Sequence, residues 1–264
     1  MASELIPRRL TSSLSCSRPP WLWTVPSALD FSICDLPDCF QQGSYPITWR
    51  AQLVSQPLTL ATDYALGLTA LAGAILLARK RRGPGSLPHR LWAAGFACVG
   101  AAAFLGGTWH GFAPGLPAVV SAALWKATLA GTGLASFFLV AGAAFGSVGR
   151  RTAAWVTSFA AGKLGVFLLW AGFHDEYDGV VVDTALAMAA ILLLQLVAWL
   201  RRRAPSAPWI AGGILLSLAA AAVEALGLSP GGPFSHDDIY HLIEIGALLL
   251  LYRGGLRLET LRPA

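Results

Sequence analysis

The chain has few charged residues. Asp, Glu, Lys and Arg make up 12% of its 264 residues, hydrophobic residues make up 55%, and the mean hydropathy is +0.60. A soluble domain normally carries about a quarter charged residues. The apolar residues also occur in blocks close to the roughly 20 residues that a membrane-spanning helix needs. The composition therefore argues against an ordinary soluble domain and predicts an all-α, polytopic membrane protein.

Cysteine is also scarce. Four scattered cysteines are too few for a disulfide framework. Cys98 lies within an apolar block, where we expect it to be inert packing. Cys34 and Cys39 could pair only if the N-terminal region were exported to an oxidising compartment.

The first 58 residues lack the continuous apolar run of a secretory signal and contain several prolines. We expect residues 1–58 to be an N-terminal extension: a small loop-rich segment, a disordered tail or the product of an early start codon. Residues 59–253 are predicted to form a transmembrane domain of seven helices, and residues 254–264 a cytoplasmic tail.

Seven apolar blocks carry the predicted helices. They are residues 59–78, 91–112, 117–146, 152–173, 179–200, 207–228 and 236–252. Asp63-Tyr-Ala-Leu opens the first block and Asp183-Thr-Ala-Leu opens the fifth. This similarity indicates a candidate 3+1+3 parallel repeat, in which two three-helix units flank the fourth helix.

Lys and Arg are absent from every second connection between the blocks. The second, fourth and sixth connections contain none, whereas the others and the C-terminal tail contain Arg79, Lys80, Arg81, Arg82, Arg90, Arg150, Arg151, Arg201, Arg202, Arg203, Arg253, Arg257 and Arg262. Basic residues favour the cytoplasmic side. The pattern therefore predicts an outer N-terminus and a cytoplasmic C-terminus. Together with the Ala-, Gly- and Arg-rich composition, it favours an integral protein of a bacterial inner membrane.

This topology places most acids and histidines near the outer ends of the helices. The residues that it brings to that leaflet or just beyond it are Asp63, His110, Lys126, Asp183, Glu224, His236, Asp237 and His241. Ionisable groups inside a membrane are costly and often functional. Their convergence predicts a polar cavity that opens outward.

The last block opens with the most concentrated polar sequence of the chain. On a helix, Asp237, His241 and Glu244 fall on one face. Ser235 and Asp238 fit an N-cap followed by an acidic residue at the third helical position. We expect Ser235, Asp238 and in one interpretation His236 to start the helix, and Asp237 and His241 to serve the site.

Two histidines and a carboxylate are predicted to bind zinc. His110 and His241 lie on different helices at matched depth, with Asp237 one turn before His241. Three protein ligands would leave a position for a water, which zinc would activate as a nucleophile. The remaining acids, Asp63, Asp183 and Glu224, are candidates for orienting a ligand or acting as a general base.

Some of the polar residues also have interpretations other than zinc binding. His110 follows Trp109 and fits an interfacial residue. Lys126 would balance a nearby acid and oppose a divalent cation, or act as a base or a Schiff-base amine. Lys163 and Glu244 lie at similar depth and are predicted to form a buried ion pair.

The layout resembles the CREST superfamily, which includes alkaline ceramidases and the progestin and adiponectin receptors. That family has Ser-x3-His in its second helix, Asp in its third and His-x3-His in its seventh. His110 and His241 match two of the histidines, and Ser235-His-Asp-Asp-Ile-Tyr-His241 is similar to a receptor motif. The resemblance implies a seven-helix fold, a zinc site and hydrolysis of a lipid amide.

Three positions depart from this family pattern. Gly106 stands in place of the serine, Asp237 in place of the first histidine of the seventh helix, and the third block has Lys126 but no Asp. The resemblance therefore implies the fold more strongly than the chemistry.

The leading functional prediction is a metal-dependent hydrolase of a lipid-like amide or ester. Zinc would be its cofactor, membrane lipid would surround it, and no nucleic acid is expected as a partner. The alternative is a transporter, channel or sensor that uses buried charges, namely Lys126, Lys163, Glu244, Asp63 and Asp183. A non-catalytic membrane protein is the third possibility.

Overall fold

The computed structural model describes residues 54–80, 87–229 and 234–258, and these are predominantly helical. The helices are α1 (Pro57–Lys80), α2 (Leu87–Phe112), the short 3-10 helix η2 (Ala113–Gly115), α3 (Ala118–Ser147), α4 (Arg150–Phe173), α5 (Asp178–Arg202), α6 (Ala207–Ala225) and α7 (His236–Gly255). The predicted all-α class is confirmed. Residues 1–53 of the predicted extension lie outside the described residues.

Six helices, α1 to α6, are long and apolar enough to cross a membrane. The seventh helix differs because Asp237, Asp238, Glu244 and Arg253 interrupt its apolar sequence. The six apolar helices agree with an integral membrane protein, and a seventh span remains a prediction. Leu68, Val166 and Leu215 are more than 60% exposed, as expected of side chains that face lipid.

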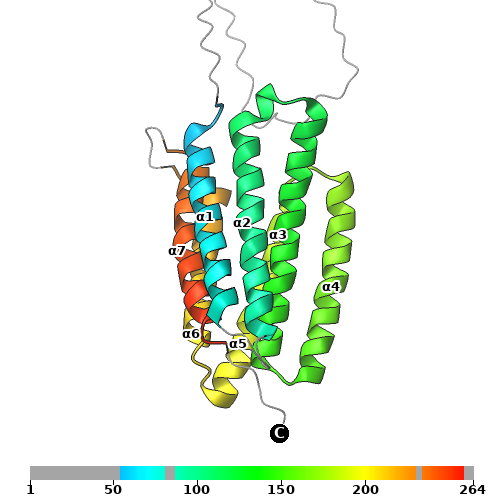
Figure 1. Cartoon of the computed structure of the whole chain (residues 1–264), viewed down its shortest axis with the longest axis vertical. Coiled ribbons are helices and arrows are strands. Elements are labelled where there is room, and N and C mark those ends of the chain that lie inside the picture. The colour runs from blue at the N-terminus through cyan, green and yellow to red at the C-terminus, as the bar shows by residue number, and fades with distance from the viewer. Residues whose placement is uncertain (1–53, 81–86, 230–233, 259–264) are drawn as a thin grey trace, which may run out of the picture. The chain divides into compact units, whose positions relative to one another are not determined.

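Six of the helices form a ring in which each helix packs against two neighbours. The order is α1, α2, α3, α5, α6 and α7, and α7 packs back against α1. The fourth helix stands outside this ring, where it packs against α3 and α5 (Figure 1). Its position beside the ring is compatible with the predicted 3+1+3 arrangement, although the repeat itself remains a prediction.

A glycine allows α2 to approach α1 closely near the start of α1. A Cβ atom at Gly107 would lie 2.7 Å from the Cβ of Asp63 and 3.0 Å from Cδ1 of Tyr64. Small residues at helix contacts let membrane helices pack closely. Gly107 therefore positions the segment of α1 that carries Asp63.

We predict that Gly107→Ala destabilises the protein by about 1–3 kcal/mol, because the added methyl group overpacks the α1–α2 contact. Thermal unfolding in detergent would measure the effect. The matched control is Gly165→Ala on α4, where an added Cβ meets nothing within 4 Å. Equal stability of the two variants would contradict this account of the contact.

Candidate functional site

Most of the acidic and histidine side chains lie where α1, α3, α5 and α7 begin and α2, α4 and α6 end. We call this region the polar end of the bundle. It corresponds to the end that the sequence predicts to face outward. The polar residues do not form one cluster, because different pairs of helices hold different groups.

The most buried of these groups joins α1 to α7. His241 Nε2 lies 3.2 Å from Asp63 Oδ1, and His241 Nδ1 lies 3.2 Å from the hydroxyl oxygen of Thr62. Asp63 is 4% exposed and His241 is 8% exposed. The second carboxylate oxygen of Asp63 is buried and has no hydrogen-bond partner among the described residues. Two adjacent residues of α1 therefore hold one imidazole of α7.

A second contact between these helices lies at the start of α7. Ser235 caps the helix: its hydroxyl accepts from the backbone N–H of Asp238, and its own N–H donates to the Asp238 carboxylate. This capping box confirms the predicted helix start. The hydroxyl of Thr59 on α1 also donates to Asp238 Oδ1 at 3.0 Å. Asp238 thus fixes the beginning of α7 and ties it to α1.

The ends of α6 and α7 carry a more open group. His236 Nδ1 lies 3.1 Å from Glu224 Oε2 and 3.3 Å from Asp237 Oδ1. All three side chains are partly exposed. Glu224, predicted to orient a metal ligand or act as a general base, therefore lies beside His236.

The three predicted zinc ligands have separate partners. His110 Nδ1 lies 2.8 Å from Gln56 Oε1, both ring nitrogens of His241 face α1, and Asp237 is beside His236. Among the described residues, the group of three His, Cys, Asp or Glu side chains whose ligand atoms all lie within 4.8 Å of one another is Glu224, His236 and Asp237. As placed, His110, Asp237 and His241 do not fit a shared zinc ion, and a site made by them remains a prediction.

Lys126 lies at the polar end but contacts the connection between α4 and α5. Its ammonium donates to the carbonyls of Ala171 and His174, both at 2.6 Å, and pairs with Asp175 at 2.8 Å. A cation is favourable at the C-terminus of a helix, where carbonyls lack partners. Lys126 therefore closes the end of α4, and the interactions that define its position are not with Asp63, Asp183 or Asp237.

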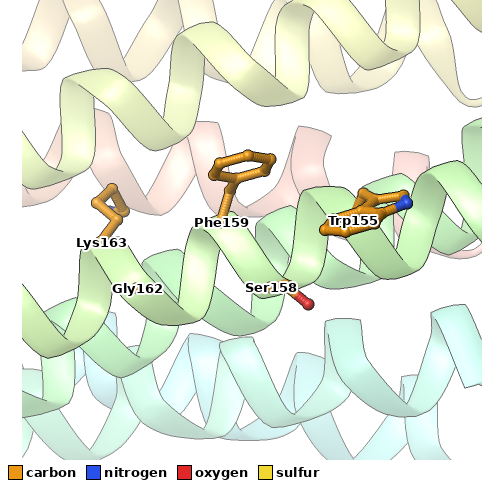
Figure 2. Close-up of a pocket in the computed structure, with 5 residues that line it drawn as sticks. All are labelled: Trp155, Ser158, Phe159, Gly162 and Lys163. Atoms are coloured by element: carbon orange, nitrogen blue, oxygen red, sulfur yellow. The ribbon is translucent and has the colours of Figure 1, made fainter.

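The predicted pairing of Lys163 with Glu244 is wrong. Lys163 on α4 pairs with Asp183 on α5, with 2.5 Å between Nζ and Oδ1, and also donates to the Asp183 carbonyl at 3.0 Å. The pairing differs because α4 packs on α3 and α5, whereas α7 packs on α1 and α6. Lys163 also lines a pocket along α4, beside Phe159 (Figure 2).

Glu244 instead faces α6, where Ser217 donates a hydrogen bond to it at 2.9 Å. The three residues predicted to share one face of α7 therefore contact three different partners. Asp237 lies beside His236, His241 contacts α1, and Glu244 contacts α6.

Sequence reasoning missed four hydroxyl and amide partners at these sites: Gln56, Thr59, Thr62 and Ser217. A signal for two of them is present in the sequence, since Thr59, Thr62 and Asp63 lie at helical spacing on one side of α1. Uncharged residues are common in membrane helices, however, so this pattern alone is weak.

The apolar helices and the polar end define the class as a helical membrane protein. Residues 58–260 match the model of a family of unknown function, DUF6962, and the chain belongs to this family. No curated protein and no solved structure gives a significant match to the chain. The family match begins at the first turn of α1, so it covers every helix described above.

We predict that Lys126→Met destabilises the protein by about 1–3 kcal/mol, because the carbonyls of Ala171 and His174 at the end of α4 lose their charged donor. Asp175→Asn is the matched control. Asp175 is 76% exposed, so losing its charge should cost less than about 1 kcal/mol. Thermal unfolding of both variants in detergent would compare the costs. A larger cost for Asp175→Asn would contradict the capping role of Lys126.

Proposed function

We propose that the protein is a proton-responsive membrane protein of the transporter, channel or sensor class, and that Asp63 and His241 share the proton to which it responds. The observation that carries this proposal is the buried contact of 3.2 Å between the carboxylate of α1 and the imidazole of α7. Buried ionisable residues of this kind commonly mark proton relays and ion pathways in membrane proteins.

The hydrogen bonds around His241 support a shared proton. The Thr62 hydroxyl oxygen lies 3.2 Å from His241 Nδ1 and 3.1 Å from the carbonyl of Thr59. If Thr62 donates to Nδ1, then Nε2 carries the proton and donates to Asp63. If Thr62 donates to Thr59, then Nδ1 donates to Thr62, and the contact with Asp63 needs a proton on Nε2 or on the carboxyl. In each arrangement one proton lies between Asp63 and His241.

A change in this proton would act on the attachment of α7 to α1. Thr62 and Asp63 are adjacent residues of α1, and both bind the same ring of α7. Asp237 and Asp238 of α7, His110 of α2 and Tyr177 are among the titratable groups close enough to influence the pair electrostatically. The pair therefore sits where protonation can alter a helix contact, which is a requirement of a sensor or a coupled transporter.

Two further polar groups lie within the bundle, apart from the Asp63–His241 pair. Glu244 lies one turn deeper along α7 than His241 and binds Ser217 of α6. Lys163 and Asp183 form a separate ion pair between α4 and α5, in which one Asp183 oxygen is buried without a hydrogen-bond partner among the described residues. Their depth supports an ion or proton function, because such groups are expensive in a membrane.

The proposal predicts that Asp63→Asn removes a carboxyl signal from infrared difference spectra recorded between acidic and neutral pH on the protein in lipid. His241→Gln should change the same signal, because the imidazole is the partner of Asp63. Asp175→Asn is the control, since Asp175 is exposed and pairs with Lys126 rather than with Asp63 or His241. An Asp63→Asn spectrum identical to that of the wild type would contradict the proposal.

A second candidate is the predicted hydrolase of a lipid-like amide or ester. The observation that favours it is the imidazole of His241 oriented by a carboxylate, which is also the arrangement of a general base. Release of fatty acid from a lipid amide that stops in His241→Gln and persists in His174→Gln would favour hydrolysis. Proton exchange by Asp63 without such release would favour the transporter, channel or sensor class.

A further inference from the structure

The polar end contains a group of three side chains that neither the Asp63–His241 pair nor the helix cap uses. Glu224 is the penultimate residue of α6, and His236 and Asp237 are the first two residues of α7. Their ligand atoms all lie within 4.8 Å of one another. Two helices, linked by residues 226–235, therefore bring one imidazole nitrogen and two carboxylates together.

The roles of neighbouring residues leave Asp237 available for this group. Asp238 forms the capping box with Ser235 and accepts the hydrogen bond from Thr59. Asp237 takes no part in that cap, and its described contact is with His236 at 3.3 Å. Because Asp238 fixes the first turn of α7, it also holds His236 and Asp237 in position opposite the end of α6.

The local charge favours a cation. The sequence from Ala204 to Tyr252 contains no Lys or Arg, and the Arg253 of α7 lies in the last turn of that helix, at the opposite end from Glu224 and Asp237. The part of α1 that lies against the start of α7 also lacks Lys and Arg, since its basic residues are at the opposite end of that helix. With a neutral imidazole and both carboxyl groups ionised, the group carries two negative charges, which match a divalent ion.

The spacing also suits a small transition-metal ion. His236 Nδ1 lies 3.1 Å from Glu224 Oε2 and 3.3 Å from Asp237 Oδ1. Ligands that bind zinc at about 2.0–2.2 Å in a tetrahedron are separated by about 3.3–3.6 Å. The two separations from His236 are thus within a few tenths of an ångström of the required values, and the ligand atoms of all three residues lie within 4.8 Å of one another. Nitrogen and carboxylate oxygen are both ordinary zinc ligands.

We propose that Glu224, His236 and Asp237 bind a divalent zinc ion at the polar end of the bundle. The ion joins the end of α6 to the start of α7, and its fourth position is open to water because the three side chains are partly exposed. This site shares Asp237 with the predicted set of His110, Asp237 and His241 but uses neither of its histidines, and it does not depend on the proton shared by Asp63 and His241.

Zinc titration of the purified, chelator-treated full chain in detergent tests the proposal by calorimetry. The wild type is expected to bind one Zn²⁺ per chain, and Glu224→Gln and Asp237→Asn are expected to weaken binding by at least about tenfold. Glu176→Gln is the matched control, because Glu176 is an exposed carboxylate in the connection between α4 and α5. His110→Gln and His241→Gln are expected to retain the ion.

X-ray absorption of the zinc-loaded wild type provides a measurement that does not depend on variants. One imidazole and oxygen ligands at about 2.0–2.2 Å are the expected coordination. Two or more imidazole ligands, or loss of zinc in His241→Gln but not in Glu224→Gln, would overturn the proposal. Absence of stoichiometric zinc binding by the wild type would overturn it as well, without affecting the infrared test of Asp63.

Discussion

The contact in which Thr62 and Asp63 bind the two ring nitrogens of His241 is one of two buried polar contacts that attach α7 to α1, the other being that of Thr59 with Asp238. A buried polar group without a partner is costly, so each of these side chains constrains the others. Gly107 contributes by letting α2 approach α1 directly beside Asp63. The position of α1 between α2 and α7 is thus tied to the chemistry of a single imidazole.

The other polar groups also join specific pairs of helices, because a side chain on one helix provides the partner for a charge or a carbonyl on the other. Lys126 joins α3 to the end of α4, Lys163 joins α4 to Asp183 of α5, and Ser217 joins α6 to Glu244 of α7. In lipid there is little hydrophobic force to hold apolar helices together, and such contacts help to specify which helices are neighbours. The polar end is therefore both a structural feature and the region where function is proposed.

Much of the fold could be predicted from the sequence, because long apolar blocks and basic connections are strong signals in a membrane protein. The capping box of Ser235 and Asp238 was also predictable, since it depends on residues three positions apart. The contacts between helices could not be predicted from the sequence in this way. Depth placed Lys163 level with Glu244, but depth does not say which helices are adjacent, and Lys163 faces Asp183. The zinc ligands predicted from the sequence rest on depth in the same way, and the three side chains face different neighbours.

A double-mutant cycle on Asp63 and His241 tests the central contact most directly. Unfolding free energies in detergent would be measured for Asp63→Asn, His241→Gln and the double variant. If the two side chains stabilise each other across α1 and α7, their coupling free energy should be at least about 1 kcal/mol. Additive effects, with a coupling close to zero, would contradict the account.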